Sequence, residues 1–559
     1  MTHKAEDFML PPADLADDYA FLGPARPDSR ITPLIDGAVF FPAMEEAVAA
    51  AEETVYCSFW SIYPDAPLLS DKVKKALGVK DWQGLLLKVI KANGVKLRIL
   101  LSDFDPIVDN NHHQSRAWNA FNSFVAGAVK AGLTKDQFQA VVSLHPDRIS
   151  GFPATYVVDK SLTKLVAAFN KARLKGLEKS PGVWPDVKIV SKSLKVRPGL
   201  TLDACPASYH QKTVVVDNRV AFLGGANWSD YFQDTAAHLK DEPTHDIFCR
   251  IEGPVVAEVE RNFVGRWNKE FPAFNAFVSL ANANGKALGY RIDDRFSIAP
   301  LALSKKTLAK QGNAVAQVHR TISGGIGSGN TVQIVRDDIK RAYQTAISKA
   351  EQYIYIENQV FRLGDMATWI INRFNATRQL QVIVVIPVVP EEVADGTADE
   401  ITLHGQALQH DALMMLKTAL GGNLGLYSLV QKKKSKRKLK FFGSTQIDVH
   451  CKMLIVDDLY ASIGSPNISP RSFQLDSEIE VGWYDGDSVK QFRQDLWTEH
   501  LESAPFGGWK VTDYVKEWDA IALKNTKAAK PEARQGVVIP HDPDKEKGTR
   551  SILIPDFLA

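Results

Sequence analysis

Hydrophobic and polar positions along the chain predict helices followed by short buried strands, and the same order occurs twice. Residues 36–64 and 336–361 each carry Ala and large apolar residues at three- and four-residue spacing, then a β-branched and aromatic run. The apolar runs 95–101 (VKLRILL) and 380–386 (LQVIVVI) follow in turn and suit buried strands. We therefore predict an α/β fold of two pseudo-symmetric α/β/α sandwich halves, each a mixed sheet flanked by helices.

Stretches without periodicity set the expected boundaries between these units. The expected units are a first half, a connection, a second half and a C-terminal extension, at residues 30–280, 281–315, 316–505 and 506–559. The Gly/Ser-rich stretch 323–330 is expected to be a mobile loop, and the polar, Pro-containing stretch 524–548 is not expected to pack as a unit.

Charge and cysteine content narrow the function classes. The 67 basic and 65 acidic residues leave a net charge of +2, which gives no overall attraction to nucleic acid or to an anionic membrane. The basic run 432–440 (KKKSKRKLK) is interpreted as a solvated, mobile loop, with a patch for anionic lipid headgroups or a nuclear address as alternatives. Four widely separated cysteines indicate reduced thiols, and neither a metal nor a cofactor is expected.

Neither a signal peptide nor a membrane span is evident in the sequence. The first 21 residues lack a basic segment followed by an apolar core, and the best apolar run, 380–389, is about half the ~20 residues that cross a bilayer. We expect a protein that is cytoplasmic, or exported by a separate machine, with no transmembrane segment.

A polar motif occurs once in each half with the same spacing. In both copies a His precedes a Lys by two residues, an Asp follows five residues later, and then come a Gly-containing pair and an Asn. The first copy is His210, Lys212, Asp217, Gly224, Gly225 and Asn227, and the second is His450, Lys452, Asp457, Gly464, Ser465 and Asn467.

This set of residues suits phosphoryl transfer without a metal. Alternation along a strand puts His and Lys on one face, so both copies together form a pocket for one tetrahedral anion. One imidazole attacks phosphorus to form a phosphohistidine, and the other protonates the leaving alkoxide. Each histidine needs an orienting carboxylate, for which Asp246 and Glu478 are the candidates. Asp217 and Asp457 lie off the His/Lys face and are interpreted as structural.

The paired motifs resemble those of the phospholipase D superfamily. Three further segments resemble the phosphatidylcholine-type branch of this superfamily: 244–268, 316–323 and 336–361, the last of which contains IYIENQ at 354–359. The similarity therefore covers roughly residues 30–500. The resemblance implies a bilobal fold, His210 as nucleophile and His450 as general acid. It also implies hydrolysis of phospholipids such as phosphatidylcholine or phosphatidylethanolamine to phosphatidic acid, with transfer to alcohols. Gly225 stands where the common pattern has Ser, so the Ser465 hydroxyl has no counterpart.

Other activities stay open at this point. The same motif serves nucleases, usually with one motif per chain, and phosphatidyl-transferring lipid synthases, which usually carry membrane helices. An inactive lipid-binding scaffold is disfavoured because both motifs are intact. The expected partner is phospholipid at a membrane surface, bound transiently by a monomer, with no nucleic acid. The chain also resembles bacterial effector phospholipases, for which a secretion or immunity partner would be expected.

A few residues outside the motif core also have expected roles. Glu357 and Gln359, with Gly225 and Ser465, are expected to bind substrate. The pair His112 and His113 is interpreted as solvated loop residues rather than metal ligands. Arg116 and Trp118 are minor substrate-contact candidates, and Phe59, Trp60 and Tyr63 are core residues or an acyl path.

Overall fold

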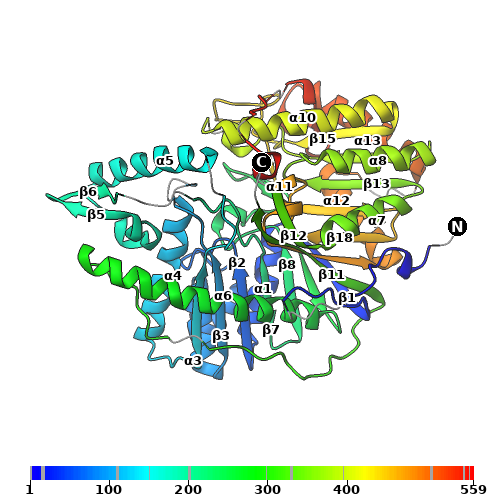
Figure 1. The fold of residues 1–559 in the computed structure, drawn as a ribbon. Helices are drawn as coiled ribbons and strands as arrows, with labels where there is room; N and C mark the ends of the chain where they lie inside the picture. Colours follow the sequence, from blue (N-terminus) through cyan, green and yellow to red (C-terminus); the bar gives the residue numbers. More distant parts are fainter. Residues whose placement is uncertain are drawn as a thin grey trace.

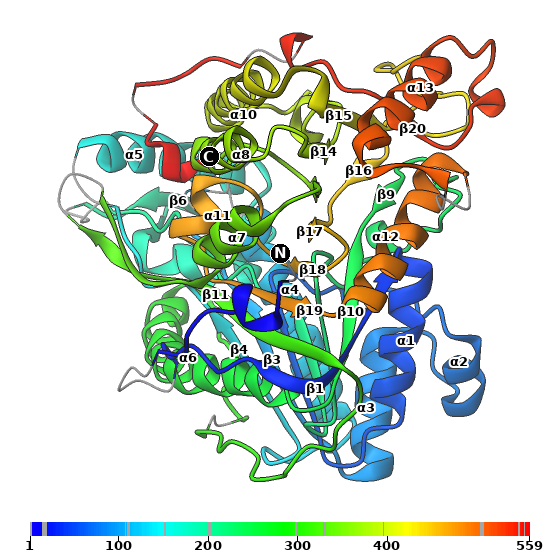
Figure 2. The ribbon, with the colours of Figure 1, turned by 90° about the vertical axis from the view of Figure 1, so that its right-hand side faces the viewer.

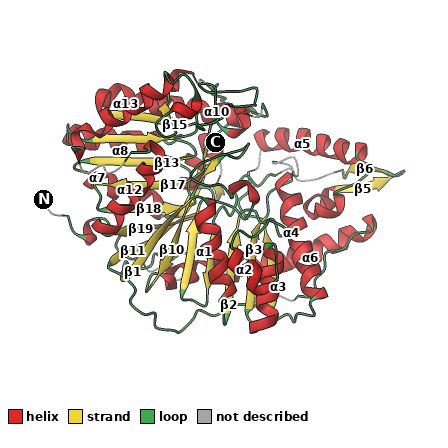
Figure 3. Cartoon of the chain, turned by 180° about the vertical axis from the view of Figure 1, so that it is seen from behind, coloured by secondary structure: helices red, strands yellow, loops and turns green. Residues whose placement is uncertain are grey.

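One mixed sheet of 16 strands runs through both halves of the chain, as the yellow strands of Figure 3 show. The structure is a computed structural model, and it describes residues 3–13, 19–106, 108, 112–149, 152–198, 203–296, 299–327, 331–394, 396–503, 508–545, 548–552 and 554–559. The α/β prediction is confirmed, with one refinement. The two halves do not hold separate sheets, because an antiparallel pairing of β1 with β11, from Arg26↔Ala316 to Ser29↔Ala314, joins them (Figures 1 and 2).

The strand order is the same in both halves when read outward from this central pairing. It runs β1-β10-β8-β7-β2-β3-β4 on one side and β11-β19-β18-β17-β13-β14-β15 on the other. The three outermost strands of each set are parallel to one another and the remaining pairings are antiparallel. The sheet therefore has a pseudo-twofold axis beside β1 and β11.

Seven strands of each half correspond one to one within this sheet. In the first half they are β1 (Arg26–Ile35), β2 (Thr54–Phe59), β3 (Lys96–Ser102), β4 (Phe138–Ser143), β7 (Thr213–Val216), β8 (Val220–Gly224) and β10 (Ile247–Glu252). In the second half they are β11 (Ala314–Gly327), β13 (Tyr353–Asn358), β14 (Gln381–Val385), β15 (Leu424–Leu429), β17 (Lys452–Val456), β18 (Tyr460–Gly464) and β19 (Glu478–Tyr484). β14, part of the apolar run at 380–386, is buried at every position because it lies between two parallel neighbours.

Helices cover both faces of the sheet (Figure 3). Those of the first half are α1 (Gly37–Ala49), α2 (Asp71–Leu77), α3 (Trp82–Asn93), α4 (His112–Lys130), α5 (Phe152–Lys171) and α6 (Val256–Gly285). Those of the second are α7 (Asp338–Lys349), α8 (Gly364–Ala376), α9 (Glu391–Ala394), α10 (Glu400–Leu420), α11 (Pro470–Gln474), α12 (Gly486–Leu501) and α13 (Tyr514–Thr526). α1 and α7 precede equivalent strands, as the repeat predicts, and α6 and α12 follow β10 and β19.

Short strands lie outside the repeated set. β12 (Thr331–Asp337) pairs with β11, β20 (Val538–Pro540) pairs with β15, β9 (Thr244–His245) pairs with β16 (Asp448–Val449), and β5 (Val187–Val190) pairs with β6 (Ser193–Val196). α5 and the β5–β6 hairpin project from the body (Figure 1). Among the described residues no helix is long and apolar enough to cross a bilayer.

Two expectations about irregular segments need correction. Part of the stretch 524–548 does pack: β20 extends the sheet beside β15, and the Asn525 side chain donates to the carbonyl of Val538 at 2.9 Å. Residues 546–547 lie outside the described residues. In the stretch 323–330, residues 323–327 continue β11 and pair with β12, while 328–330 lie outside the described residues. The expected division into four units stays a prediction.

Candidate active site

A three-residue hairpin loop in each half positions the motif. Asp217 and Asn218, between β7 and β8, have φ of 54° and 50°, and Asp457 and Asp458, between β17 and β18, both have φ of 55°. Such turns need two left-handed residues, a conformation that Asp and Asn tolerate.

The two motif aspartates also hold the loops that lead into β2 and β13, the strands beside the motif hairpins. The Asp217 carboxylate accepts the backbone N–H groups of residues 52, 53 and 54 at 2.7 to 2.9 Å. The Asp457 carboxylate accepts those of residues 351, 352 and 353 at 2.5 to 2.9 Å. Each aspartate therefore joins its motif hairpin to the strand beside it, and neither points toward the histidines.

Each motif histidine is tied through its backbone to the other half. The His210 N–H donates to the carbonyl of Ser477 at 2.9 Å, and the His450 N–H donates to the carbonyl of His245 at 2.8 Å. Since Ser477 precedes Glu478 and His245 precedes Asp246, each contact places a carboxylate of one half beside the histidine of the other.

Glu478 of the second half orients His210 of the first. Its oxygens lie 2.9 and 3.1 Å from His210 Nδ1, and the Ser472 hydroxyl donates to it at 2.7 Å. The Ser465 hydroxyl donates to it as well. Burial is the largest influence on the Glu478 carboxyl and raises its pKa to about 7, against the opposing effect of Lys212.

Asp246 of the first half orients His450 of the second. Its Oδ2 lies 2.7 Å from His450 Nδ1, and its Oδ1 accepts the N–H of Ile247 at 2.7 Å. The carboxylates are therefore exchanged between the halves, so neither half holds a complete histidine–carboxylate pair. Both imidazoles keep some solvent contact, at 15% exposure for His210 and 11% for His450.

Burial favours neutral imidazoles at both positions. It is the largest cause that lowers the pKa of His450 to about 4, and Lys452 adds to it while Asp246 opposes it. Burial and then Lys212 lower the pKa of His210 well below its ordinary value. A neutral imidazole with Nδ1–H held by a carboxylate presents its Nε2 lone pair, as a nucleophile requires.

The motif lysines are buried and share one electrostatic environment. Lys212 Nζ donates to the carbonyl of His210 at 2.7 Å, and Lys452 Nζ donates to that of His450. Burial lowers the pKa of both lysines, and the Lys452 ammonium of the second half also lowers the pKa of Lys212 and of His210 in the first half. Two buried cations without a bound anion are costly, so the site favours an anionic ligand.

The Gly225–Ser465 difference follows from the unequal carboxylates. A Cβ on Gly225 would lie 2.5 Å from Asp246 Oδ1 and 2.9 Å from the His450 carbonyl, so no side chain fits there. The Asp246 carboxylate itself occupies the space that a side chain at position 225 would need. On the other side the Ser465 hydroxyl contacts the longer acid. Ser465 therefore positions Glu478, and Gly225 makes room for Asp246.

This packing predicts the effect of restoring the common pattern at 225. Gly225→Ser is expected to displace Asp246 from His450 and lower kcat by ~10-fold or more, because a misplaced acid/base group loses much of its contribution. Gly364→Ser, at a glycine with no atoms near its Cβ position, is the matched control and should keep wild-type kcat and thermal stability. Wild-type kcat in Gly225→Ser would contradict the tight fit.

The two motif asparagines differ in their contacts. Asn227 Oδ1 accepts the N–H of Ser61 at 3.1 Å. Asn467 Oδ1 is buried and has no hydrogen-bond partner within the described ranges. The asparagines of the two halves are therefore not equivalent.

Glu357 and Gln359, the two residues of the IYIENQ segment that were expected to bind substrate, lie in different places. Gln359 lies at the site, where its Oε1 accepts from Lys452 Nζ at 3.2 Å. Glu357 is fully buried on the other side of β13's end, where His500 Nε2 lies 2.8 Å from its carboxylate and Tyr355 also donates to it. The structure therefore does not bring Glu357 to a substrate surface.

His113 is not a solvated loop residue, and that interpretation is wrong. It lies in α4, is 2% exposed, has Nε2 3.2 Å from the carbonyl of Ser102, and stacks on Trp60 with ring centroids 3.8 Å apart. Trp60 in turn presents its edge to the His210 ring at 6.0 Å. The side chain of His112 lies outside the described residues. Trp118 is a core residue whose indole donates to Asp103 at 3.0 Å, and Arg116 is exposed.

Sequence reasoning missed several residues that support the histidines. Ser472 contacts Glu478, and Phe232 packs on the His450 ring with centroids 4.8 Å apart. Asp476 accepts from the N–H of Ser208 at 2.7 Å and from Arg471 at 2.6 Å, which fixes the strand that carries His210. The only sequence signal for them is their closeness to the motif or to the candidate acids.

The basic run is partly neutralised by acidic residues of both halves. Lys433 lies 3.5 Å from Asp241, Arg437 lies 2.6 Å from Glu242, and Lys432 lies 2.5 Å from Glu502. These ion pairs reduce the charge that the run offers to a lipid surface.

Comparisons with known proteins agree with the motif geometry. A family model described as "Phospholipase D" matches residues 224–406 and 427–508 and so includes the second His-x-Lys but begins after the first. Phospholipase D alpha 2 of Arabidopsis thaliana is 24% identical and covers 82% of this chain and 63% of its own length. Phospholipase D alpha 1 of Oryza sativa is 24% identical over 85% of this chain and 66% of its own length. The chain thus spans just under two thirds of these relatives.

Among solved structures, phosphatidylserine synthase from Haemophilus influenzae Rd KW20 aligns with 94% of this chain and 98% of its own, at 13% identity and a TM-score of 0.49. Membership rests instead on two motif copies with matching spacing, the family match across both halves and the relatives aligned over most of the chain. The chain belongs to the phospholipase D superfamily.

Proposed function

We propose that the chain hydrolyses glycerophospholipids on the headgroup side of the phosphodiester, releasing phosphatidic acid and the free alcohol. The observation that carries this proposal is the exchange of carboxylates, Glu478 to His210 and Asp246 to His450, around two buried lysines. That arrangement supplies two oriented imidazoles and two cations for a single phosphodiester. Relatives named phospholipase D support the substrate class.

In the first step, we propose, His210 is the nucleophile. Its Nε2 lone pair forms a bond to phosphorus, and the bond from phosphorus to the headgroup oxygen breaks. His450, which takes up a proton when the anionic phosphodiester binds and offsets the charge of the nearby lysines, gives that proton to the headgroup oxygen. Glu478 holds the Nδ1–H of His210 and balances the positive charge that the ring gains.

In the second step His450, now neutral, takes a proton from water, and the water oxygen attacks phosphorus. The nitrogen–phosphorus bond breaks, His210 is restored, and phosphatidic acid leaves. Lys212 and Lys452, with Asn227 and Asn467, donate to the nonbridging phosphate oxygens in both steps. Gln359 beside Lys452 orients that ammonium.

The covalent step predicts transfer to alcohols, because a small alcohol can replace water in the second step. Protein incubated with phosphatidylcholine or phosphatidylethanolamine vesicles and ethanol should yield phosphatidylethanol, and without ethanol only phosphatidic acid, as measured by mass spectrometry of the lipids. No product across a headgroup panel, with plasmid DNA degraded instead, would replace this proposal by a nuclease. Transfer of the phosphatidyl group to another lipid headgroup in place of hydrolysis would indicate a lipid synthase.

A further inference from the structure

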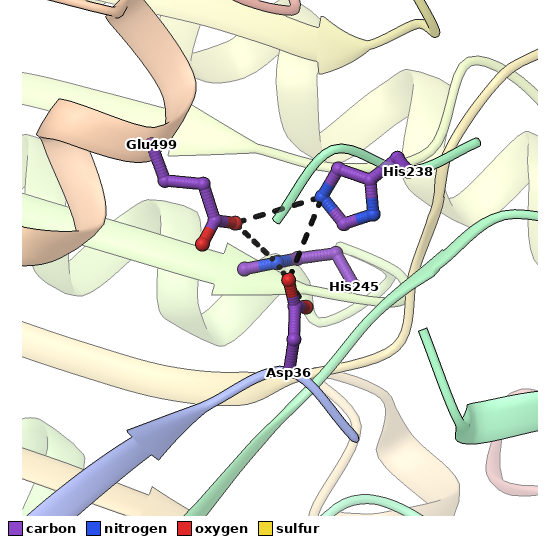
Figure 4. A group of neighbouring side chains, drawn as sticks. All are labelled: Asp36, His238, His245 and Glu499. Carbon is purple, nitrogen blue, oxygen red and sulfur yellow. Dashed lines mark hydrogen bonds and ion pairs between the residues drawn. The ribbon is translucent and has the colours of Figure 1, made fainter. Parts of the chain in front are cut away.

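Beside the active site, four acidic and histidine side chains from distant parts of the chain point toward one buried place (Figure 4). Asp36 lies in the turn between β1 and α1, His238 and His245 come from the segment around β9, and Glu499 comes from α12. Asp36, His238 and His245 are at most 2% exposed, and the Glu499 side chain is 9% exposed. Both halves of the chain contribute to this cluster, which we call the interlobe cluster.

The distances within the interlobe cluster fit ligands of a common ion. His238 Nε2 lies 3.6 Å from Glu499 Oε1 and 3.8 Å from Asp36 Oδ2. His245 Nδ1 lies 3.0 Å from Glu499 Oε1 and 3.1 Å from Asp36 Oδ1. Tetrahedral ligands at bonds of about 2.0–2.1 Å are about 3.3 Å apart, so these separations match a coordination shell.

Hydrogen bonding alone leaves the cluster unsatisfied. His238 Nε2, Asp36 Oδ2 and Glu499 Oε1 are all buried, and none has a hydrogen-bond partner in the part of the chain that the structure describes. The 3.6 and 3.8 Å separations at His238 exceed the ~2.7–3.2 Å of a nitrogen–oxygen hydrogen bond. Buried polar atoms of native proteins rarely stay unpaired, and three that face one another indicate a missing common partner.

The outer contacts of both histidines follow the pattern of metal-binding imidazoles. A metal-binding histidine usually donates its other ring N–H to a carboxylate or carbonyl. His238 has Nδ1 3.3 Å from Asp234 Oδ2, and His245 has Nε2 3.2 Å from Glu357 Oε2. Asp234 therefore fixes the ring of His238, whose Nε2 faces the centre of the cluster. His245 Nδ1 faces the same centre and is hydrogen-bonded to Asp36 Oδ1 at 3.1 Å, a contact that an ion bound between them would replace.

Charge balance points to a divalent cation. A metal ligand must be a neutral imidazole, and with both histidines neutral the carboxylates of Asp36 and Glu499 give the four ligands a charge of −2. Within the described ranges, the carboxylates of Asp36, Glu499, Asp234 and Glu357 form ion pairs with histidines and with no Lys or Arg. Two imidazole nitrogens and two carboxylate oxygens suit Zn²⁺, with other divalent transition metals as competitors.

We propose that the interlobe cluster binds one divalent transition metal ion, Zn²⁺ by preference, as a structural link between the two halves. All four coordination positions are taken by side chains, which is typical of a structural rather than a catalytic site. The ion would fix His245, whose carbonyl accepts the His450 N–H and whose neighbour Asp246 orients His450. His245 is thereby a positioning residue. This site departs from the sequence-based expectation of no metal, because its ligands are spread from Asp36 to Glu499.

The test uses the untagged full chain expressed with added Zn²⁺. Elemental analysis is expected to find about one Zn per chain, and removal with dipicolinate is expected to lower Tm reversibly. Replacement by Co²⁺ should give visible ligand-field bands of a tetrahedral nitrogen–oxygen site. His238→Gln and Glu499→Gln should each lose the metal.

The matched control is His319→Gln, at another fully buried histidine with a carboxylate, Glu480, 3.3 Å away. It should keep the metal whatever its effect on Tm. If wild-type protein holds no stoichiometric metal and neither Zn²⁺ nor chelator moves its Tm, the interlobe cluster is a metal-free ion-pair network and the proposal fails. Wild-type Co²⁺ spectra decide the matter even if the variants do not fold. None of these readouts requires phospholipase activity, so the metal proposal and the proposed function fail separately.

Discussion

His210→Ala is expected to abolish turnover and covalent intermediate together, with kcat reduced by at least ~10⁴-fold, since no other group can form the bond to phosphorus. His450→Asn is expected to behave differently. It removes the proton donor and later the base, which costs ~10²–10⁴-fold in kcat, but leaves the nucleophile in place. The two substitutions therefore separate roles that the near-symmetric motifs leave equivalent.

One difference in the structure supports His210 as nucleophile. Its partner Glu478 accepts from the hydroxyls of Ser465 and Ser472, which anchors that carboxylate, whereas Asp246 beside His450 accepts from the backbone N–H of Ile247. Burial lowers the pKa of both histidines, and a neighbouring lysine adds to the effect in each case. A nucleophile benefits from a fixed, unprotonated ring, and an acid from a ring that can gain a proton.

A substrate with a good leaving group makes the role difference measurable. Phosphatidyl-p-nitrophenol needs no acid for its first step, so His450→Asn should release one equivalent of p-nitrophenolate in a burst and accumulate phosphatidyl-enzyme. Intact-protein mass spectrometry under basic conditions reads the adduct directly. His210→Ala should show neither burst nor adduct, and His410→Gln, at a histidine outside the site, should match wild type. The reverse pattern would exchange the two roles.

The sequence was sufficient to predict the repeat, and the repeat determined most of the fold. Matching periodicity before β2 and β13 and matching apolar runs at β3 and β14 predicted equivalent halves, because both signals arise from local burial. The joining of both sheets through β1 and β11 was not predictable in this way. Pairing between two sheets depends on which edge strands remain unpaired within each half, and no local sequence pattern indicates that.

The sequence indicated which residues form the active site but not how they are arranged. Motif spacing pointed to both histidines and both acids, but the exchange of Glu478 and Asp246 between halves depends on how the lobes meet. Glu357 was expected to bind substrate but is buried against His500. The sequence does not separate these outcomes, since a polar residue at a strand end can face a pocket or a buried cluster.

Glu478→Gln is expected to remove the acid limb of the pH–activity profile. Burial raises the pKa of Glu478 to about 7, so in the wild type the carboxyl is protonated below that pH and cannot stabilise the positive charge that His210 gains on phosphorylation. Wild-type kcat should therefore rise with pH and level off above about 7. The amide variant should lose ~10²–10⁴-fold in kcat at pH 8 and show no rise near 7.

Stability should change in the opposite sense. The folded pKa of Glu478 lies above its unfolded value of about 4.5, so the folded state favours the proton and loses stability as pH rises from about 4.5 to 7. Glu478→Gln escapes this loss, and its Tm relative to wild type should increase over that interval. Glu480→Gln, on the same strand and beside His319, is the matched control and should keep the acid limb. An unchanged limb in Glu478→Gln would assign the titration to another group and leave Glu478 only an orienting contact.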